Sequence, residues 1–222
     1  MKVELHAVDA IILLTASTVL ILGCLQPSEE IQKLQSVEVR NYEGKDLSSI
    51  ADLPENSIKG PQYVNIANYS LMVYGLVEHP RNYTYDEVLS RNRYSKVVTL
   101  NCVEGWSVDI LWEGVLVNDL FDDAGVLDSA NTVILYAYDG YSTSFPISYI
   151  RDNRIMLAYQ MNNVTLPAER GFPFQLVAED KWGYKWIKWI TKIELSNDSS
   201  YEGYWEQRGY SQFGDLGKSK FV

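Results

Sequence analysis

Short apolar runs rich in β-branched and aromatic residues recur along most of this chain, and turn signals separate them. Runs of this length are typical of strands, whereas the helical signals are few and short. We expect an α+β fold of mixed β-sheets with short helices. The expected strands are 69–77, 96–100, 131–138, 154–161, 172–178 and 189–195.

Two short helices are expected between these strands. One begins after Thr84, where Glu87 completes a capping box, and the other covers 117–125 and ends at Gly125. Residues 139–146, "DGYSTSFP", are expected to form a loop. The aromatic, glycine-rich stretch 201–217 is expected to wrap on the surface, because its aromatic side chains need burial.

The first residues of the chain are unlike the rest. From Ala10 the apolar run "AIILLTASTVLILGC" is too short for an ordinary membrane-spanning helix, which needs about 20 residues, and it suits a signal-peptide core. Its last four residues, "ILGC", resemble a lipobox in which Cys24 becomes the lipidated residue. An uncleaved N-terminal anchor is the alternative. Both interpretations predict an extracytoplasmic domain (periplasmic, or on the outer face of the cell membrane) that is membrane-anchored.

The chain divides by composition into three parts. Residues 1–24 form the signal or anchor segment, 25–57 are expected to be a polar tether, and 58–222 are expected to be one domain. The formal net charge is −10. Such an acidic surface repels phosphate backbones, so nucleic acid is excluded as a partner.

The domain contains one cysteine, Cys102, and one histidine, His79. Hydrolysis by a catalytic triad needs a histidine base, but His79 lies in a turn-like stretch, "EHPRN", where a solvated side chain is expected. A zinc site needs three or four ligands, which these two residues do not supply. A dinucleotide-binding G-x-G-x-x-G after a strand and a Walker A loop are both missing from the sequence. Paired carboxylates for glycoside chemistry stay open, because no spacing singles out a pair.

Cys102 follows the expected strand 96–100 in "TLNCVEGWS". A thiolate held at a strand end suits a soft or high-valent metal that another group already chelates, and Gly105 permits close backbone approach. The alternative is a buried free cysteine that acts as a small hydrophobe, which position alone favours.

Several ordered segments resemble the molybdopterin-binding domain of the sulfite oxidase family, within which "CVEGWS" is closest to the periplasmic methionine-sulfoxide reductase catalytic subunit. The resemblance covers most of 58–210, about two-thirds of the chain. The segments are "TLNCVEGWSVDILWEGVLVNDLFDDAG", "DGYSTSFPI", "LAYQMNNVTLPAERGFPFQLVAEDKWGYKWIKWITKIEL" and "GYWEQRGY".

The resemblance implies a Mo-molybdopterin cofactor with Cys102 as the sole protein ligand to the metal. It implies that Arg170 donates to the cofactor phosphate or pterin. Gln175 stands where relatives usually carry arginine, a departure that removes one fixed cation. The stretch "KWIK" matches residues that hold the cofactor in relatives: Lys185, Trp186, Ile187 and Lys188. The alternatives are a surface strand for both lysines and core packing for Trp186.

Two further residues carry roles by resemblance. Glu104 matches a carboxylate of the reductase branch that can relay a proton near the metal, and its alternative is a solvated loop acid. Tyr141 lies on a loop that borders the metal in relatives, where its hydroxyl can orient substrate oxygen. Its alternative is a packed loop tyrosine.

Together these observations predict a molybdenum oxidoreductase that transfers an oxygen atom, with reduction of an S- or N-oxide expected. The single domain resembles the reductase branch, so we expect electrons from a separate haem- or quinol-linked partner. Oxidation of sulfite, a small oxyanion, is the first alternative. A non-catalytic binding lipoprotein on the same fold is the second.

Overall fold

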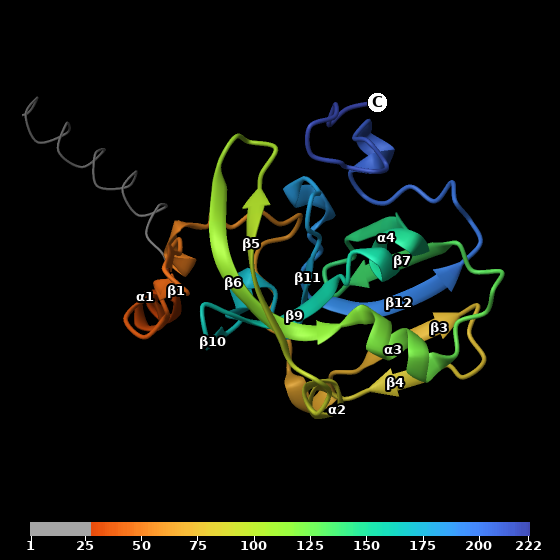
Figure 1. The fold of residues 1–222 in the computed structure, drawn as a ribbon, viewed down its shortest axis with the longest axis horizontal. Helices are drawn as coiled ribbons and strands as arrows, with labels where there is room; N and C mark the ends of the chain where they lie inside the picture. The colour runs from red at the N-terminus through yellow and green to blue at the C-terminus, as the bar shows by residue number, and fades with distance from the viewer. Residues whose placement is uncertain (1–27) are drawn as a thin grey trace, which may run out of the picture.

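The computed structural model describes residues 28–222 (Figure 1). The signal-peptide and lipobox predictions lie outside these residues. Within 28–222, no helix combines the length and the apolar character that a membrane crossing requires.

One five-stranded sheet carries the β-hairpin at whose tip Cys102 lies. Its order is β10-β9-β6-β5, and β11 also pairs with β9. All these pairs are antiparallel. Gly114 of β6 sits at a register shift against β9, where an added Cβ would lie 2.1 Å from the carbonyl oxygen of Leu157. The strands are β5 (Tyr94–Asn101), β6 (Ser107–Leu116), β9 (Met156–Met161), β10 (Val164–Thr165) and β11 (Gln175–Val177).

The second sheet has the order β4-β3-β12-β7-β8, with β12 and β3 parallel. The loop predicted over 139–146 is wrong from Ser142 onward, because those residues form β8. The polar residues of β8 concealed the strand: Thr143 and Ser144 are buried and bond to Glu206 and to the Tyr201 carbonyl. The strands are β3 (Leu71–Gly75), β4 (Arg81–Tyr83), β7 (Thr132–Ala137), β8 (Ser142–Pro146) and β12 (Ile190–Ser196).

Short helices cover the sheets, as expected. α2 (Tyr85–Leu89) begins with the reciprocal Thr84–Glu87 capping box, and α3 (Val117–Ala124) ends at Gly125 in the left-handed conformation. The remaining elements are α1 (Glu29–Gln35), α4 (Ile147–Asp152), β1 (Asn41–Tyr42), β2 (Lys45–Asp46) and the 3-10 turns η2 (Ile50–Asp52), η3 (Ile66–Asn68), η4 (Ala168–Arg170), η5 (Gly183–Lys185) and η6 (Glu206–Arg208).

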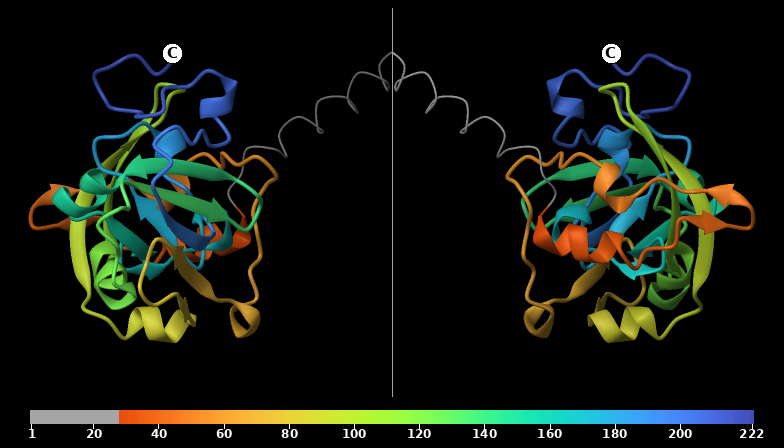
Figure 2. Two further views of the ribbon diagram at one scale, coloured as in Figure 1. Left: turned by 90° about the vertical axis from the view of Figure 1, so that its right-hand side faces the viewer. Right: turned by 90° about the vertical axis from the view of Figure 1, so that its left-hand side faces the viewer.

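The polar tether expected over 25–57 is contradicted from Ser28 onward, because 28–57 fold against the domain (Figure 2). Ile31 and Ile50 are buried in the core. The buried carboxylate of Glu38 accepts hydrogen bonds from the Ser49 hydroxyl, the Ile50 amide and the Asn162 side chain. Asn162 lies 124 residues from Glu38 in the sequence, so local periodicity could not reveal this contact.

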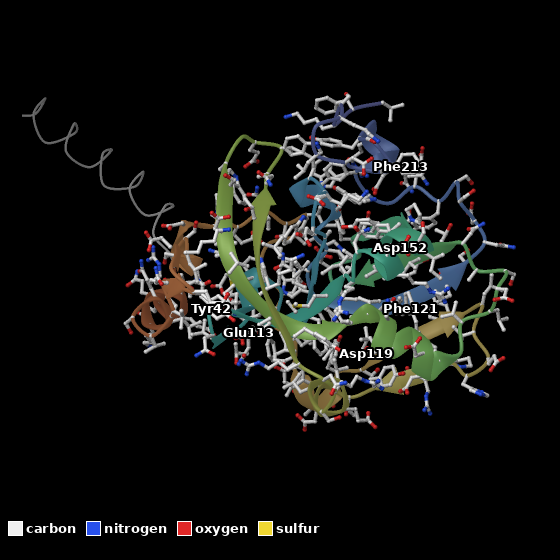
Figure 3. The ribbon with its side chains drawn as sticks, in the orientation of Figure 1. Tyr42, Glu113, Asp119, Phe121, Asp152 and Phe213 are labelled. Atoms are coloured by element: carbon white, nitrogen blue, oxygen red, sulfur yellow. The ribbon has the colours of Figure 1, made fainter. Side chains whose placement is uncertain are left out.

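The C-terminal stretch wraps on the surface, as predicted, beside the tip of the β5–β6 hairpin (Figure 1). Tyr210 packs against Tyr184 and Phe221, with ring centroids 5.0 and 4.9 Å apart. Phe213 points outward from it, with 55% of its surface exposed (Figure 3).

Candidate active site

The tip of the β5–β6 hairpin fixes the position of Cys102. The Cys102 amide donates to the Trp106 carbonyl at 2.9 Å, and the Gly105 amide donates back to the Cys102 carbonyl at 3.1 Å. Gly105 closes this turn at a φ of +95°, a conformation that favours glycine. Cys102 is only 7% exposed, and burial raises the pKa of its thiol. A strand end and a tight turn therefore hold this one sulfur in a defined place.

The Cys102 side chain forms part of the wall of a cavity of about 410 Å³. The other walls come from 53–58, 139–141, 169–189 and 205–210, so the cavity joins segments that are distant in sequence. Eight of the nine residues that the sequence singled out line it: Cys102, Glu104, Tyr141, Arg170, Gln175, Trp186, Ile187 and Lys188.

Lys185 is the exception. It was expected to hold the cofactor, but it does not line the cavity. Its ammonium is fully buried and donates to Glu206 at 2.6 Å and to the carbonyls of Ser144 and Gln212 at 2.7 and 2.8 Å. Burial lowers its pKa to about 8, against the opposing effect of Glu206. Lys185 thus holds the C-terminal stretch against β8.

Two cations of the cavity wall, Arg170 and Lys188, come from opposite ends of the stretch 169–189. Arg170 donates from Nε to the Ile50 carbonyl at 3.2 Å, but its buried Nη1 has no hydrogen-bond partner within 28–222. Lys188 donates to Glu55 at 2.8 Å and to the Glu169 carbonyl at 3.2 Å. Burial lowers the pKa of both cations. A buried donor without a partner is costly, so Arg170 is set to receive an acceptor from the cavity.

Asn56 was not found from the sequence, because it lies in the stretch expected to be a tether. Its side-chain amide donates to Glu104 at 3.0 Å and lies 3.7 Å from the Cys102 sulfur. The indole of Trp106 donates to the same Glu104 oxygen at 3.2 Å. Two donors therefore fix the Glu104 carboxylate beside the thiol.

Tyr141 lines the cavity, but its hydroxyl donates to the Tyr184 carbonyl. Burial raises its pKa well above the ordinary value, so it is a neutral donor at physiological pH. Both alternatives therefore hold in part, because the Tyr141 side chain packs against the core and also lines the cavity.

Residues 58–205 match the family model described as oxidoreductase molybdopterin binding domain. This chain belongs to that family. The oxidoreductase YuiH of Bacillus subtilis, itself uncharacterized, is 35% identical over 70% of this chain and 78% of its own length. A relative from Azospira oryzae, YedZ1, named as a protein-methionine-sulfoxide reductase subunit, is 35% identical over 68% of this chain and 57% of its own length.

Sulfite oxidases are more distant members. The mitochondrial sulfite oxidase of Drosophila melanogaster is 28% identical over 55% of this chain, which spans only 24% of that enzyme. Among solved structures, the sulfane dehydrogenase SoxCD from Paracoccus pantotrophus aligns with a TM-score of 0.61 and 22% identity, over 68% of this chain and 42% of that chain. The resemblance to the sulfite oxidase family and the expected fold class are thereby confirmed. The chain is a molybdopterin-dependent oxidoreductase.

The residues of this molybdopterin-binding domain fit the cofactor. Among residues 28–222, no cluster of three histidine, cysteine or carboxylate side chains could hold a bare metal ion. A metal here must bring ligands of its own, as molybdopterin does with its dithiolene, and take one soft sulfur from the protein. The unpartnered Nη1 of Arg170 is a donor of the kind that the cofactor's anionic phosphate requires.

Proposed function

We propose that this chain reduces organic S- or N-oxides at a molybdenum-molybdopterin centre. The observation that carries this proposal is the charge of the cavity wall. Four carboxylates line it, against two cations, Arg170 and Lys188, and Lys188 is already paired with Glu55. A dianion such as sulfite would be repelled from such a wall, whereas a neutral oxide would not. The carboxylates are Glu55, Glu104, Asp139 and Glu169.

When bound, the cofactor would supply two-electron redox chemistry and an acceptor for the oxygen atom of the substrate. Cys102 would hold the metal through Sγ. Arg170 and Lys188 would hold the anionic end of the cofactor, while Gln175, Trp186 and Ile187 would line its bed. The neutral Gln175 in place of an arginine leaves Arg170 as the guanidinium available at this end of the wall.

Reduction of an S- or N-oxide to the sulfide or amine releases the oxygen as water, and it consumes two protons for each two electrons. Glu104 is the carboxylate nearest the sulfur in the hydrogen-bond network, since Asn56 contacts both. We assign Glu104 the transfer of protons to the departing oxygen, a role worth ~10²–10⁴ in rate in other enzymes. Tyr141 would border the substrate with its ring, its hydroxyl being committed to Tyr184.

The test is a comparison of two reactions on the same preparation. The full chain, produced in a host that makes molybdopterin, is expected to hold about one molybdenum per chain by elemental analysis. It should oxidise a reduced viologen dye with methyl sulfoxides or an amine N-oxide at a kcat/KM at least about tenfold above that for sulfite with ferricyanide. Faster sulfite oxidation would replace the proposal with the oxidase alternative, and a molybdenum-free protein would contradict both.

We also propose that the domain is extracytoplasmic and is held at the membrane through Cys24, with electrons supplied by a separate haem- or quinol-linked protein. The apolar run and the sequence "ILGC" support the anchor. In a Cys24→Ala variant, incorporation of labelled palmitate should disappear and the enzyme should no longer be lipid-anchored. Undiminished labelling of the variant would exclude Cys24 as the lipid site, and Cys102→Ala serves as the control that should still be labelled.

A further inference from the structure

Residues 201–222, the C-terminal segment, form one side of the cavity. Trp205 and Tyr210 line it, and both side chains are half-buried. Their rings lie 5.2 Å apart, and the Tyr210 ring packs edge-on against Tyr184, which also lines the cavity. These three residues make a continuous aromatic surface, which we call the aromatic wall.

The aromatic wall begins next to Cys102. Gly183, which precedes Tyr184, lies so close that an added Cβ would be 3.4 Å from the Cys102 Cα. The far end of the C-terminal segment returns to the same turn, since the Lys220 ammonium donates to the Val103 carbonyl at 2.7 Å. The aromatic wall therefore borders the sulfur that would hold the metal.

The two cations suited to an anionic cofactor, Arg170 and Lys188, are held by residues outside the C-terminal segment. Arg170 bonds to the Ile50 carbonyl, and Lys188 bonds to Glu55 and the Glu169 carbonyl. The cavity thus has a charged region for the cofactor and an aromatic wall beside the sulfur.

The C-terminal segment is fastened before any ligand binds. Glu206 accepts from Lys185 and from the Thr143 hydroxyl, both buried, at 2.6 Å each. The Trp182 amide donates to the Gly214 carbonyl at 2.8 Å, and Lys181 forms an ion pair with Asp215. A preorganised wall loses little conformational entropy when a substrate covers it, so its contacts contribute to affinity.

We propose that the aromatic wall determines specificity, and that Trp205 and Tyr210 select oxides that carry an aromatic or large alkyl substituent. This inference rests on the proposed oxide reduction and names its substrate class. Uncharged rings gain affinity from burying apolar area, and stacking adds to this for an aryl group. A small oxide such as dimethyl sulfoxide can reach the end of the cavity at Cys102 without covering the aromatic wall.

Binding and turnover can be measured separately. Methyl p-tolyl sulfone carries the aryl group of the matching sulfoxide and serves as a probe that is bound without being reduced, and dimethyl sulfone is its small counterpart. Calorimetry on the full-length holoenzyme should give a Kd for the aryl sulfone that rises about tenfold in Trp205→Ala and in Tyr210→Ala. The Kd for dimethyl sulfone should change less than about twofold, because one truncated ring affects only what covers it.

Two further variants control for folding. Trp205→Phe keeps a ring and should retain most of the aryl preference. Phe213→Ala removes an exposed ring of the same segment that does not line the cavity, and should leave both Kd values unchanged. The KM for methyl p-tolyl sulfoxide should follow the Kd of the sulfone across the series.

The outcomes separate the two proposals. Equal effects on the two sulfones, or no effect on either, or no aryl sulfone bound by the wild type, would overturn the aromatic wall as a specificity element even if oxides are reduced. Selective loss of aryl sulfone binding in an enzyme that reduces no oxide would support the wall as a binding surface and overturn the proposed reaction.

Discussion

A Cys102→Ser variant is expected to lose oxide reduction by a factor of ~10³ or more while staying folded. A serine hydroxyl is a harder ligand than a thiolate and keeps its proton at neutral pH, so it cannot replace the sulfur on a molybdenum centre. The Cys102 side chain is buried, but serine differs from cysteine only by an oxygen in place of the sulfur. The substitution should therefore remove only a small part of the free energy of unfolding. The variant should retain a cooperative melting transition.

Three measurements check this expectation: turnover per chain, molybdenum content and visible absorption. The thiolate-to-molybdenum charge-transfer band should be absent from Cys102→Ser even where some cofactor remains bound. Ser107→Ala, an exposed change on the same hairpin, should keep both band and turnover. A Cys102→Ser enzyme with more than a tenth of the normal rate would rule out the thiol as the metal ligand and return Cys102 to the role of a small buried hydrophobe.

The second large effect concerns stability. Replacing Lys185 by methionine should lower the free energy of unfolding by about 3–5 kcal/mol, because it leaves the buried Glu206 carboxylate without its counter-charge. The Ser144 and Gln212 carbonyls lose a donor in the same step. Since Glu206 and Gln212 belong to the C-terminal segment, that segment should also become more sensitive to proteases.

Urea unfolding of Lys185→Met, beside the exposed control Lys218→Met, measures this effect. The double variant Lys185→Met/Glu206→Leu should recover much of the loss, because no buried charge is then unpaired. If the double variant loses as much free energy of unfolding as Lys185→Met, then packing and not the unpaired charge causes the destabilisation. A Lys185→Met protein as stable as the wild type would contradict the structural role assigned to the lysine.

The same comparison has a pH dependence of known sign. The pKa of Lys185 is lowered from 10.5 to about 8 in the folded protein, so the unfolded chain binds more protons between these values. The contribution of this group to the free energy of unfolding should therefore rise with pH from about 8 to 10.5. The difference in free energy of unfolding between the wild type and Lys185→Met should therefore widen from pH 8 to 10.5. A difference that narrows over this range would contradict the lowered pKa.

The elements marked by local signals were predicted well. All six expected strands are present as β3, β5, β7, β9, β11 and β12. Of the two expected helices, α2 begins at its capping box and α3 ends at its glycine, as indicated. Cys102 directly follows its strand, as expected, and the structure places it on the cavity wall. These features depend on neighbouring residues, which is the information that a single sequence carries most directly.

The features that were not predicted from the sequence depend on contacts between distant segments. β6 was not recognised, because its second half is buried without the alternation that identifies a half-exposed strand. Asn56 reaches the sulfur only after 28–57 have packed against 160–190, and Lys185 differs from Lys188 only in what surrounds it. Identical residue types in one short stretch, "KWIK", thus received different roles from the fold.

The packed N-terminal stretch would also limit how far an enzyme anchored through Cys24 can move from a membrane. Ser28 already caps α1 by accepting from the Ile31 amide, and only four residue steps separate it from Cys24. Fully extended, these steps reach at most ~14 Å. With a lipid on Cys24, the catalytic unit would search a thin layer above the bilayer instead of a volume. Electron-donor proteins confined to the same layer would meet the enzyme often, and substrates would have to come to the membrane surface.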